Sequence, residues 1–290
     1  MVTITYFQAL VIGLIQGVTE LFPISSLGHS VLIPALFGGS WQTLVTQSSS
    51  KTSNQYLTFI VALHVATAIA LIIFYWATWR RVVLAFFRTL STRKIKTSDE
   101  RLAWLLIFGT IPVGIIGLIL EKPFRELFAK PLAAAIFLMI NGCILLFGEY
   151  MRRRAGQSHT RELSSLSMPE GAAIGSFQVL ALLAGISRSG ITLVGGLVRG
   201  LDREDAANFA FLLATPVIFL AGLYKLPSLA SQTGHAMVGQ VIVGALAAGI
   251  AAYLSVRFLT KYFQTKTLTP FAIYCLVAGA LFALKFTIWS

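Results

Sequence analysis

Two short polar clusters interrupt long apolar stretches of this chain, and each cluster holds one charged residue. The first spans residues 16–29 and contains Glu20, the only charged side chain among the first fifty residues. The second spans residues 185–192 and contains Arg188, the only charge between residues 171 and 198. Because an unpaired charge is costly to bury in apolar surroundings, charges placed in this way are candidates for function. Their opposite signs predict that the two clusters form one site.

The spacing within the first cluster predicts both a cation site and a nucleophile. Gln16 and Glu20 are four residues apart and share one face of a helix, and their oxygens suit a hard divalent cation such as Mg²⁺ or Ca²⁺. Ser25 and Ser26 precede His29 by three or four residues, and a hydroxyl with an imidazole can form a nucleophile and its base. We expect Ser26 to be the nucleophile, assisted by His29. Ser25 is either a substrate ligand or a capping residue.

The second cluster is suited to binding an anion. Arg188 presents a planar fork of donors that matches a phosphate group. Glycines allow backbone N–H groups to converge on an anion, and hydroxyls add further donors. The expected catalytic residues are therefore Glu20, Ser26, His29 and Arg188, and the expected ligands of a phosphate-containing substrate are Gln16, Ser25, Gly185, Ser187, Ser189, Gly190 and Thr192. Together these groups predict phosphoryl transfer, which depends mainly on positioning and charge stabilisation.

Each assignment has a structural alternative. Glu20 and Arg188 can form an ion pair that serves only the fold, and Gln16 can hydrogen-bond between helices. His29 can be a buried histidine with structural partners. We interpret the three remaining histidines as structural: His64, His159 and His235.

The composition of the chain indicates a membrane protein. Of its 290 residues 56% are hydrophobic and only 12% are charged, against about 25% charged in a soluble domain. Crossing a bilayer takes roughly 20 apolar residues in a helix. We predict full spans near residues 57–78, 103–120, 131–150, 206–226, 236–258 and 269–288.

The basic residues predict the topology. The net charge is +12, and 16 of the 23 basic residues fall in four connections, near residues 79–101, 151–168, 199–205 and 257–268. Short basic loops stay in the cytoplasm, which explains the charge better than nucleic-acid binding does. All four connections lie inside if each polar cluster enters the membrane and returns to the same side. We therefore expect an all-α polytopic fold of about six spans and two re-entrant helical pairs, with both termini outside.

The two clusters also align with each other at a constant offset. Gln16 and Gln178, Ser25 and Ser187, and Gly28 and Gly190 are each 162 residues apart (178 − 16, 187 − 25 and 190 − 28). A re-entrant pair followed by three spans has an odd number of crossings, so a second copy would be inverted. We predict one membrane domain, residues 1–290, with an inverted repeat of residues 1–150 and 169–290. Inverted repeats around a central polar site are frequent in transporters.

These motifs resemble the bacterial undecaprenyl-diphosphatase family, the integral-membrane type associated with bacitracin resistance. The resemblance covers nearly the whole chain. It rests on Gln16-x-x-x-Glu20, Ser25-Ser26-x-Gly28-His29, Gly185-x-Ser187-Arg188-Ser189-x-x-Thr192, Phe211-Leu212-Leu213-Ala214-Thr215-Pro216 and Pro270-Phe271-Ala272-Ile273-Tyr274.

The resemblance implies hydrolysis of undecaprenyl diphosphate to undecaprenyl phosphate, which recycles the lipid carrier of cell-wall polymers. It further implies a divalent cation and a site that faces the outer side of the bacterial plasma (inner) membrane. The substrate and the surrounding lipid are then the expected partners, nucleic acid is not, and a homodimer is an open alternative to a monomer. Two positions depart from the family pattern: Ala184 replaces a usual proline, and Gln16 leaves Glu20 as the only carboxylate of its motif.

Two questions stay open at this stage. Water activated by Glu20 or His29 is a rival to attack by Ser26. A membrane transporter or flippase of a polyprenyl phosphate is the rival to the enzyme, because the repeat suits it equally well, although transport alone needs no nucleophile.

Overall fold

The computed structural model describes residues 4–47, 55–120, 130–155, 161–232 and 237–288. Within these ranges the chain is helical, and its β-type pairing is limited to one isolated bridge. In chain order the elements are α1 (Tyr6–Leu21), α2 (Ser26–Phe37), α3 (Gly39–Gln47), α4 (Gln55–Phe74), α5 (Trp76–Thr92), α6 (Ser98–Ile119), α8 (Pro131–Ala155), η2 (Leu163–Ser165), α9 (Met168–Ser176), η3 (Phe177–Leu182), α10 (Arg188–Val198), α11 (Arg203–Gln232), α12 (Val238–Thr265) and α13 (Thr269–Ile288).

Five of the described helices are long and apolar enough to cross a membrane: α6, α8, α11, α12 and α13. Helices α4 and α5 supply a sixth crossing if the bent pair is counted as one span. The prediction of an all-α polytopic membrane protein with about six spans is therefore confirmed.

The span predicted at residues 57–78 ends earlier than expected. Helix α4 stops at Phe74, and the chain turns by 88° into α5. The hydroxyl of Tyr75 at the bend donates to Asn208 Oδ1 of α11 over 2.7 Å, which fixes the corner. Arg80 and Arg81 follow directly, and because arginine is costly at membrane depth, the helix leaves the span direction there.

Both polar clusters lie where a helix is interrupted. The chain is extended at Phe22 after α1, and α2 starts after Ser25, whose φ of 71° is unusual for a residue with a side chain. In the second cluster Gly185, with φ of 115°, separates η3 from α10. The helices on either side of these breaks have 16, 12, 9, 6 and 11 residues, so each is too short to cross a bilayer alone.

Each interrupted helical pair packs closely against a long helix through a contact between two glycines, which we call a glycine seam. Helix α1 packs on α12, where a Cβ added to Gly13 would lie 2.3 Å from the carbonyl oxygen of Gly244. Helix α9 packs on α6, where a Cβ added to Gly175 would lie 2.1 Å from the carbonyl oxygen of Gly109. Small residues allow such close approach of helix backbones in membranes. Gly13 and Gly175 are again 162 residues apart, so both polar breaks are held by the same kind of contact.

An ion pair and two hydrogen bonds hold the connection before α9 in place. Glu170 pairs with Arg161 over 2.6 Å and accepts hydrogen bonds from the backbone and hydroxyl of Ser167. These interactions lower the pKa of the Glu170 carboxyl to about 2. Together they fix the start of α9 relative to the connection that precedes it.

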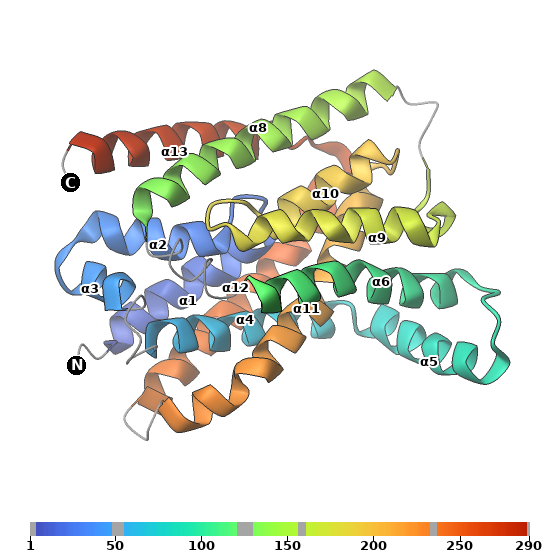
Figure 1. The fold of residues 1–290 in the computed structure, drawn as a ribbon, viewed down its shortest axis with the longest axis horizontal. Coiled ribbons are helices and arrows are strands. Elements are labelled where there is room, and N and C mark those ends of the chain that lie inside the picture. The colour runs from blue at the N-terminus through green and yellow to red at the C-terminus, as the bar shows by residue number, and fades with distance from the viewer. Residues whose placement is uncertain (1–3, 48–54, 121–129, 156–160, 233–236, 289–290) are drawn as a thin grey trace.

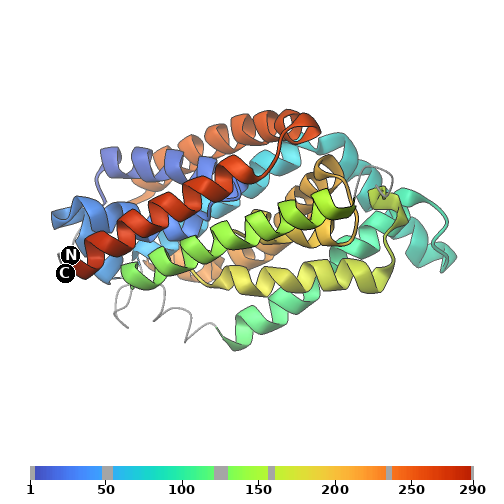
Figure 2. The same ribbon diagram turned by 90° about the horizontal axis from the view of Figure 1, so that it is seen from above.

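The ends of the molecule differ in charge. Figures 1 and 2 show α8 and α13 side by side, with both termini at one end. The α5–α6 turn and residues 161–167, which precede α9, lie at the opposite end (Figure 1). Those connections carry Arg93, Lys94, Lys96 and Arg161. These four basic residues therefore lie at the end away from both termini.

The α9–α6 seam gives a direct test of this packing. We expect Gly175→Ala to lower the free energy of unfolding by about 1–3 kcal/mol, because the new methyl group must displace a backbone carbonyl. Gly114→Ala is the matched control, since its Cβ would meet no atom within 4 Å and alanine is the better helix former. Thermal unfolding of both variants in detergent checks this. Equal stability of the two variants would contradict the close approach of α9 to α6.

Candidate active site

The two polar clusters line one cavity in the interior of the protein. Its volume is about 220 Å³, which is roughly the space of seven water molecules. Most of its wall is apolar and comes from α4, α6, η3 and α11. The polar lining residues are Glu20, Ser25, Ser26, His64, Gln178, Ser187 and Arg188.

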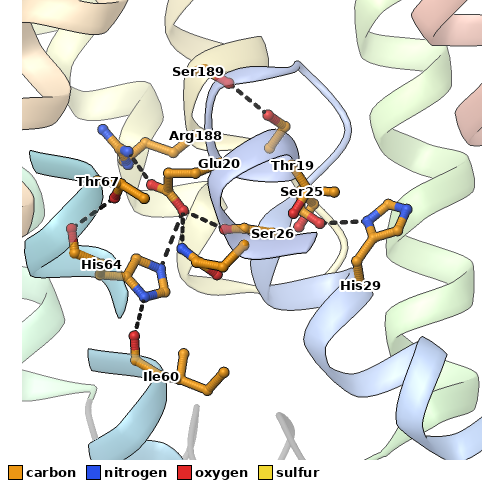
Figure 3. Close-up of polar contacts among 12 residues, drawn as sticks. Thr19, Glu20, Ser25, Ser26, His29, Ile60, His64, Thr67, Arg188 and Ser189 are labelled. Carbon is orange, nitrogen blue, oxygen red and sulfur yellow. Dashed lines mark hydrogen bonds and ion pairs between the residues drawn. The ribbon is translucent and has the colours of Figure 1, made fainter. Parts of the chain in front are cut away.

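The centre of this site is the ion pair between Glu20 and Arg188. Arg188 Nη2 donates to Glu20 Oε1, and both side chains are largely buried, with 4% of Glu20 and 14% of Arg188 exposed. The charged residues of the two clusters are thus in direct contact, although 168 positions separate them (Figure 3). The other guanidinium nitrogen, Nη1, is buried without a partner among the described residues, so one edge of the fork is left for a ligand.

The second oxygen of the Glu20 carboxylate collects three further donors. The Ser26 hydroxyl donates to Oε2, and Gln16 Nε2 donates to the same atom over 2.9 Å. His64 Nε2 lies 3.2 Å from it. Glu20 is therefore surrounded by donors from α1, α2, α4 and α10, and Figure 3 shows these side chains converging on it. The Ser26–Glu20 hydrogen bond is the geometry of a hydroxyl nucleophile with a carboxylate base.

His64 is the main site residue that the sequence analysis missed. It was interpreted as structural, but the structure places it against the Glu20 carboxylate. Its Nδ1 donates to the carbonyl oxygen of Ile60 over 2.8 Å, which turns Nε2 toward Glu20. The available signal was a lone imidazole in the apolar span 55–74, which is unusual enough to be a functional candidate.

The predicted pairing of His29 with Ser26 is not what the structure shows. His29 Nδ1 donates to the carbonyl oxygen of Ser25 over 2.7 Å, and Nε2 accepts from the Tyr274 hydroxyl over 2.7 Å. Its ring stacks on that of Tyr274, with centroids 5.7 Å apart. The reason is tertiary packing: the ring of His29 lies on Tyr274 of α13, and this contact with its two hydrogen bonds holds the imidazole away from Ser26. His29 therefore points away from Glu20 (Figure 3) and holds the first turn of α2.

Ser25 and Ser187 occupy equivalent places as helix caps. Ser25 Oγ accepts from the backbone N–H of Gly28 over 3.2 Å and from that of Gly185 over 3.1 Å, so it links the two breaks. Ser187 Oγ accepts from the backbone N–H of Gly190 over 3.1 Å. Both serines line the cavity, and a hydroxyl that accepts an N–H group can still donate its own hydrogen.

Asn141 of α8 is a second residue that the sequence analysis did not identify. It is fully buried, its Oδ1 accepts from the Ser187 N–H, and its Nδ2 donates to the Pro23 carbonyl oxygen, both over 2.9 Å. One amide thus satisfies a backbone group in each break. A single asparagine in the apolar run 131–150 was the signal for it.

The remaining predicted ligands lie behind the cavity wall. Ser189 is 3.1 Å from the Ser187 hydroxyl, Thr192 Oγ1 is buried without a partner in the described part of the chain, and neither residue lines the cavity. Gly185 and Gly190 serve the close packing of the breaks. An added Cβ would lie 2.4 Å from the Ala134 carbonyl oxygen at Gly185 and 3.1 Å from the Ser187 side chain at Gly190. Of the residues predicted to bind an anion, Arg188, Ser25 and Ser187 line the cavity.

Few side chains at this site could ligate a metal cation. No group of three His, Cys, Asp or Glu side chains that could hold a metal occurs among the residues that the structure describes. However, Gln16 Oε1 is buried beside Glu20 and has no partner among those residues. An amide oxygen and one carboxylate fit a Mg²⁺-like ion whose remaining ligands are water and phosphate oxygens. The residues present therefore fit a cation that a phosphate-containing ligand helps to hold.

Comparisons with known proteins agree on one family. The family model described as Bacitracin resistance protein BacA matches residues 9–281. Undecaprenyl-diphosphatase 2 of Frankia alni is 56% identical to this chain, over an alignment that covers 98% of the chain and 99% of the relative. Undecaprenyl-diphosphatase of Mycolicibacterium paratuberculosis is 54% identical over 95% of each, and undecaprenyl-diphosphatase 2 of Burkholderia ambifaria is 43% identical over 93% of each.

The buried ion pair leads to a prediction about stability. Removing one partner leaves an uncompensated charge, so we expect Arg188→Met to cost about 3 kcal/mol of unfolding free energy. The double variant Arg188→Met, Glu20→Gln no longer has an unpaired carboxylate. Its unfolding free energy should exceed that of Arg188→Met by at least about 1 kcal/mol, roughly the coupling energy of two residues in direct contact. Denaturation of the two single variants and the double variant gives the coupling. Strict additivity would mean that Glu20 and Arg188 do not interact.

Proposed function

This chain belongs to the bacitracin resistance protein BacA family, and we propose that the cavity around Glu20 is where it hydrolyses undecaprenyl diphosphate to undecaprenyl phosphate and phosphate. The activity is that of a phosphatase acting on a diphosphate lipid. The observation that supports this cavity as the site is the contact of one carboxylate with both a serine hydroxyl and an arginine.

Arg188 holds the diphosphate in this proposal. Its Nη2 is anchored on Glu20, so the planar fork is oriented before the substrate arrives, and the buried Nη1 is left to donate to a phosphate oxygen. The hydroxyl hydrogens of Ser25 and Ser187 add donors from the two caps. Arginine and hydroxyl donors stabilise the negative charge that spreads over the phosphoryl oxygens during transfer.

Ser26 is the proposed nucleophile and Glu20 its base. Ser26 Oγ forms a bond to the terminal phosphorus, the bond from that phosphorus to the bridging oxygen breaks, and the serine proton passes to Glu20 Oε2. Water then attacks the phosphoserine, the phosphorus–Oγ bond breaks, and the proton returns to Ser26 as phosphate leaves. His64 keeps the carboxylate oriented through Nε2. Direct attack by a water that Glu20 deprotonates is the rival route.

A divalent cation, Mg²⁺ or Ca²⁺, is part of the proposal. Glu20 and the unpartnered Gln16 Oε1 would hold it, together with phosphate oxygens of the substrate. Bound there, it would supply positive charge against the diphosphate.

We further propose that the protein lies in the bacterial plasma (inner) membrane with its basic end in the cytoplasm and both termini outside. The gathering of Arg93, Lys94, Lys96 and Arg161 away from the termini supports this orientation. Two re-entrant pairs in an inverted repeat, residues 1–150 and 169–290, then carry the site to the outer side. The matching seams at Gly13 and Gly175 support the repeat. Assembly as a homodimer is compatible with this arrangement.

Flipping of a polyprenyl phosphate is a second candidate activity, and the proposed repeat is the observation that favours it. Phosphate release distinguishes the two, since transport alone releases none. Purified protein that binds undecaprenyl phosphate but releases no phosphate from undecaprenyl diphosphate would leave transport as the function of the cavity.

Variants of Ser26, His64 and His29 test the proposed roles. We expect Ser26→Ala and His64→Leu to lower kcat by at least about 100-fold, because they remove the nucleophile and the support of its base. His29→Gln should lower kcat less than tenfold, since His29 contacts Ser25 and Tyr274 rather than Glu20. Phosphate release from undecaprenyl diphosphate, with a search for phosphoserine, measures this. Full activity of Ser26→Ala would exclude the covalent route and favour direct attack by water.

Metal removal tests the cation site. A chelator should abolish phosphate release, and added Mg²⁺ or Ca²⁺ should restore it. Gln16→Met should raise the cation concentration for half-maximal activity by roughly tenfold, because one oxygen ligand is lost, while kcat at saturating cation changes little. Gln178→Met is the matched control, since Gln178 lines the cavity but does not contact Glu20. Activity that is unchanged by the chelator would reject the cation.

A further inference from the structure

The α5–α6 hairpin carries positive charge that its own acidic residues do not balance. Asp99 pairs with Arg81 over 3.4 Å. Glu100 is used at the start of α6, where it accepts the backbone N–H groups of Lys96 over 2.6 Å and Thr97 over 3.0 Å. The other cations of the hairpin are exposed and form no ion pair with a carboxylate of the described residues: Arg80, Arg88, Arg93, Lys94, Lys96 and Arg101.

Two of these cations line a hollow at the end of α5. The hollow has a volume of about 380 Å³, and its wall includes Arg93, Lys94 and Trp104. The Trp104 indole donates to Thr89 Oγ1 over 3.0 Å, and this hydrogen bond joins α5 and α6 in the wall of the hollow. Arg93 itself adopts a left-handed conformation, with φ of 51°, and directs the chain around this hollow.

An apolar groove begins beside this hollow. It has a volume of about 550 Å³ and lies between α5, α6 and α11, with Phe86, Gly114 and Leu220 among its lining residues. The rings of Phe86 and Trp104 touch, with centroids 5.6 Å apart, so the groove and the basic hollow meet at this pair. Figure 1 shows the hairpin at the end of the molecule away from both termini.

We propose that the hollow and the groove together bind one anionic phospholipid. The phosphate of its head group lies on Arg93 and Lys94, and an acyl chain lies in the groove along α6. Basic pockets between membrane helices at the cytoplasmic side are suited to anionic head groups. The groove is lined mostly by apolar side chains, which suit an acyl chain.

This lipid site is separate from the hydrolytic cavity. Different residues of α6 line the two sites: Thr110 and Gly114 line the groove, and Val113 lines the cavity. The basic hollow contains none of the cavity residues. A neutral lipid would fill the groove but leave the cations of the hollow unpaired, so the charge selects an anionic head group.

Native mass spectrometry of the purified protein tests the site with phosphatidylglycerol and phosphatidylcholine as probes. We expect the wild type to retain one phosphatidylglycerol and to discriminate against phosphatidylcholine. The double variant Arg93→Gln, Lys94→Gln should bind phosphatidylglycerol at least tenfold more weakly, from the loss of two interfacial charges. Gly114→Leu should weaken it as well, because its side chain enters the groove at a position where a Cβ meets no protein atom.

The matched control is Arg257→Gln, Lys261→Gln, which removes two exposed cations from the end of α12. It should retain phosphatidylglycerol as the wild type does. If this control loses phosphatidylglycerol as much as the Arg93→Gln, Lys94→Gln variant does, the lipid is attracted by the basic end as a whole and not by this site. If the wild type retains phosphatidylglycerol and phosphatidylcholine equally, the bound lipid is ordinary boundary lipid. Either result would overturn the proposal, and neither depends on phosphatase activity.

Discussion

A carboxylate buried in an apolar protein is the constraint on which this structure depends. Glu20 is 5% exposed, and charge in such surroundings is tolerated only with close partners. Its donors come from four elements: Gln16 of α1, Ser26 of α2, His64 of α4 and Arg188 of α10. These elements must therefore converge for the fold to be stable. The same convergence produces the candidate active site, so stability and chemistry depend on one group.

The helix breaks around this carboxylate are also satisfied from within. A backbone interrupted at membrane depth has lost helical hydrogen bonds and needs protein partners in their place. Ser25 and Ser187 cap the helices that follow, Ser25 also binds the N–H of Gly185, and Asn141 joins one backbone group from each break. Among the described residues, the buried side-chain atoms of this region that have no partner are Gln16 Oε1, Ser30 Oγ, Gln178 Oε1, Arg188 Nη1 and Thr192 Oγ1. Of these, Arg188 Nη1 and Gln16 Oε1 suit a phosphate oxygen and a cation.

The two polar clusters have similar sequences but unequal roles. Gln16 donates to the Glu20 carboxylate, whereas Gln178, 162 residues later, donates to the backbone carbonyls of Gly109 and Gly175. One cluster contributes the carboxylate and the proposed nucleophile, and the other contributes the guanidinium. In the proposed inverted repeat the two copies therefore carry opposite charges, because two identical copies would place like charges next to each other. Opposite charges let the same scaffold form a stable pair at its centre.

The sequence by itself determined the class of fold and the identity of the central pair. Long apolar helices are visible in composition, and isolated charges such as Glu20 and Arg188 are conspicuous because burial makes them costly. The i,i+4 relation of Gln16 and Glu20 also followed from local helical geometry, and the structure has it. The bend after Phe74 did not follow, because it depends on the contact of Tyr75 with Asn208 of α11. The tertiary structure alone decided which imidazole reaches the carboxylate. His29 is near Ser26 in sequence but turns to Tyr274, while His64 comes from a distant span, because contacts between helices are set by packing and not by separation along the chain.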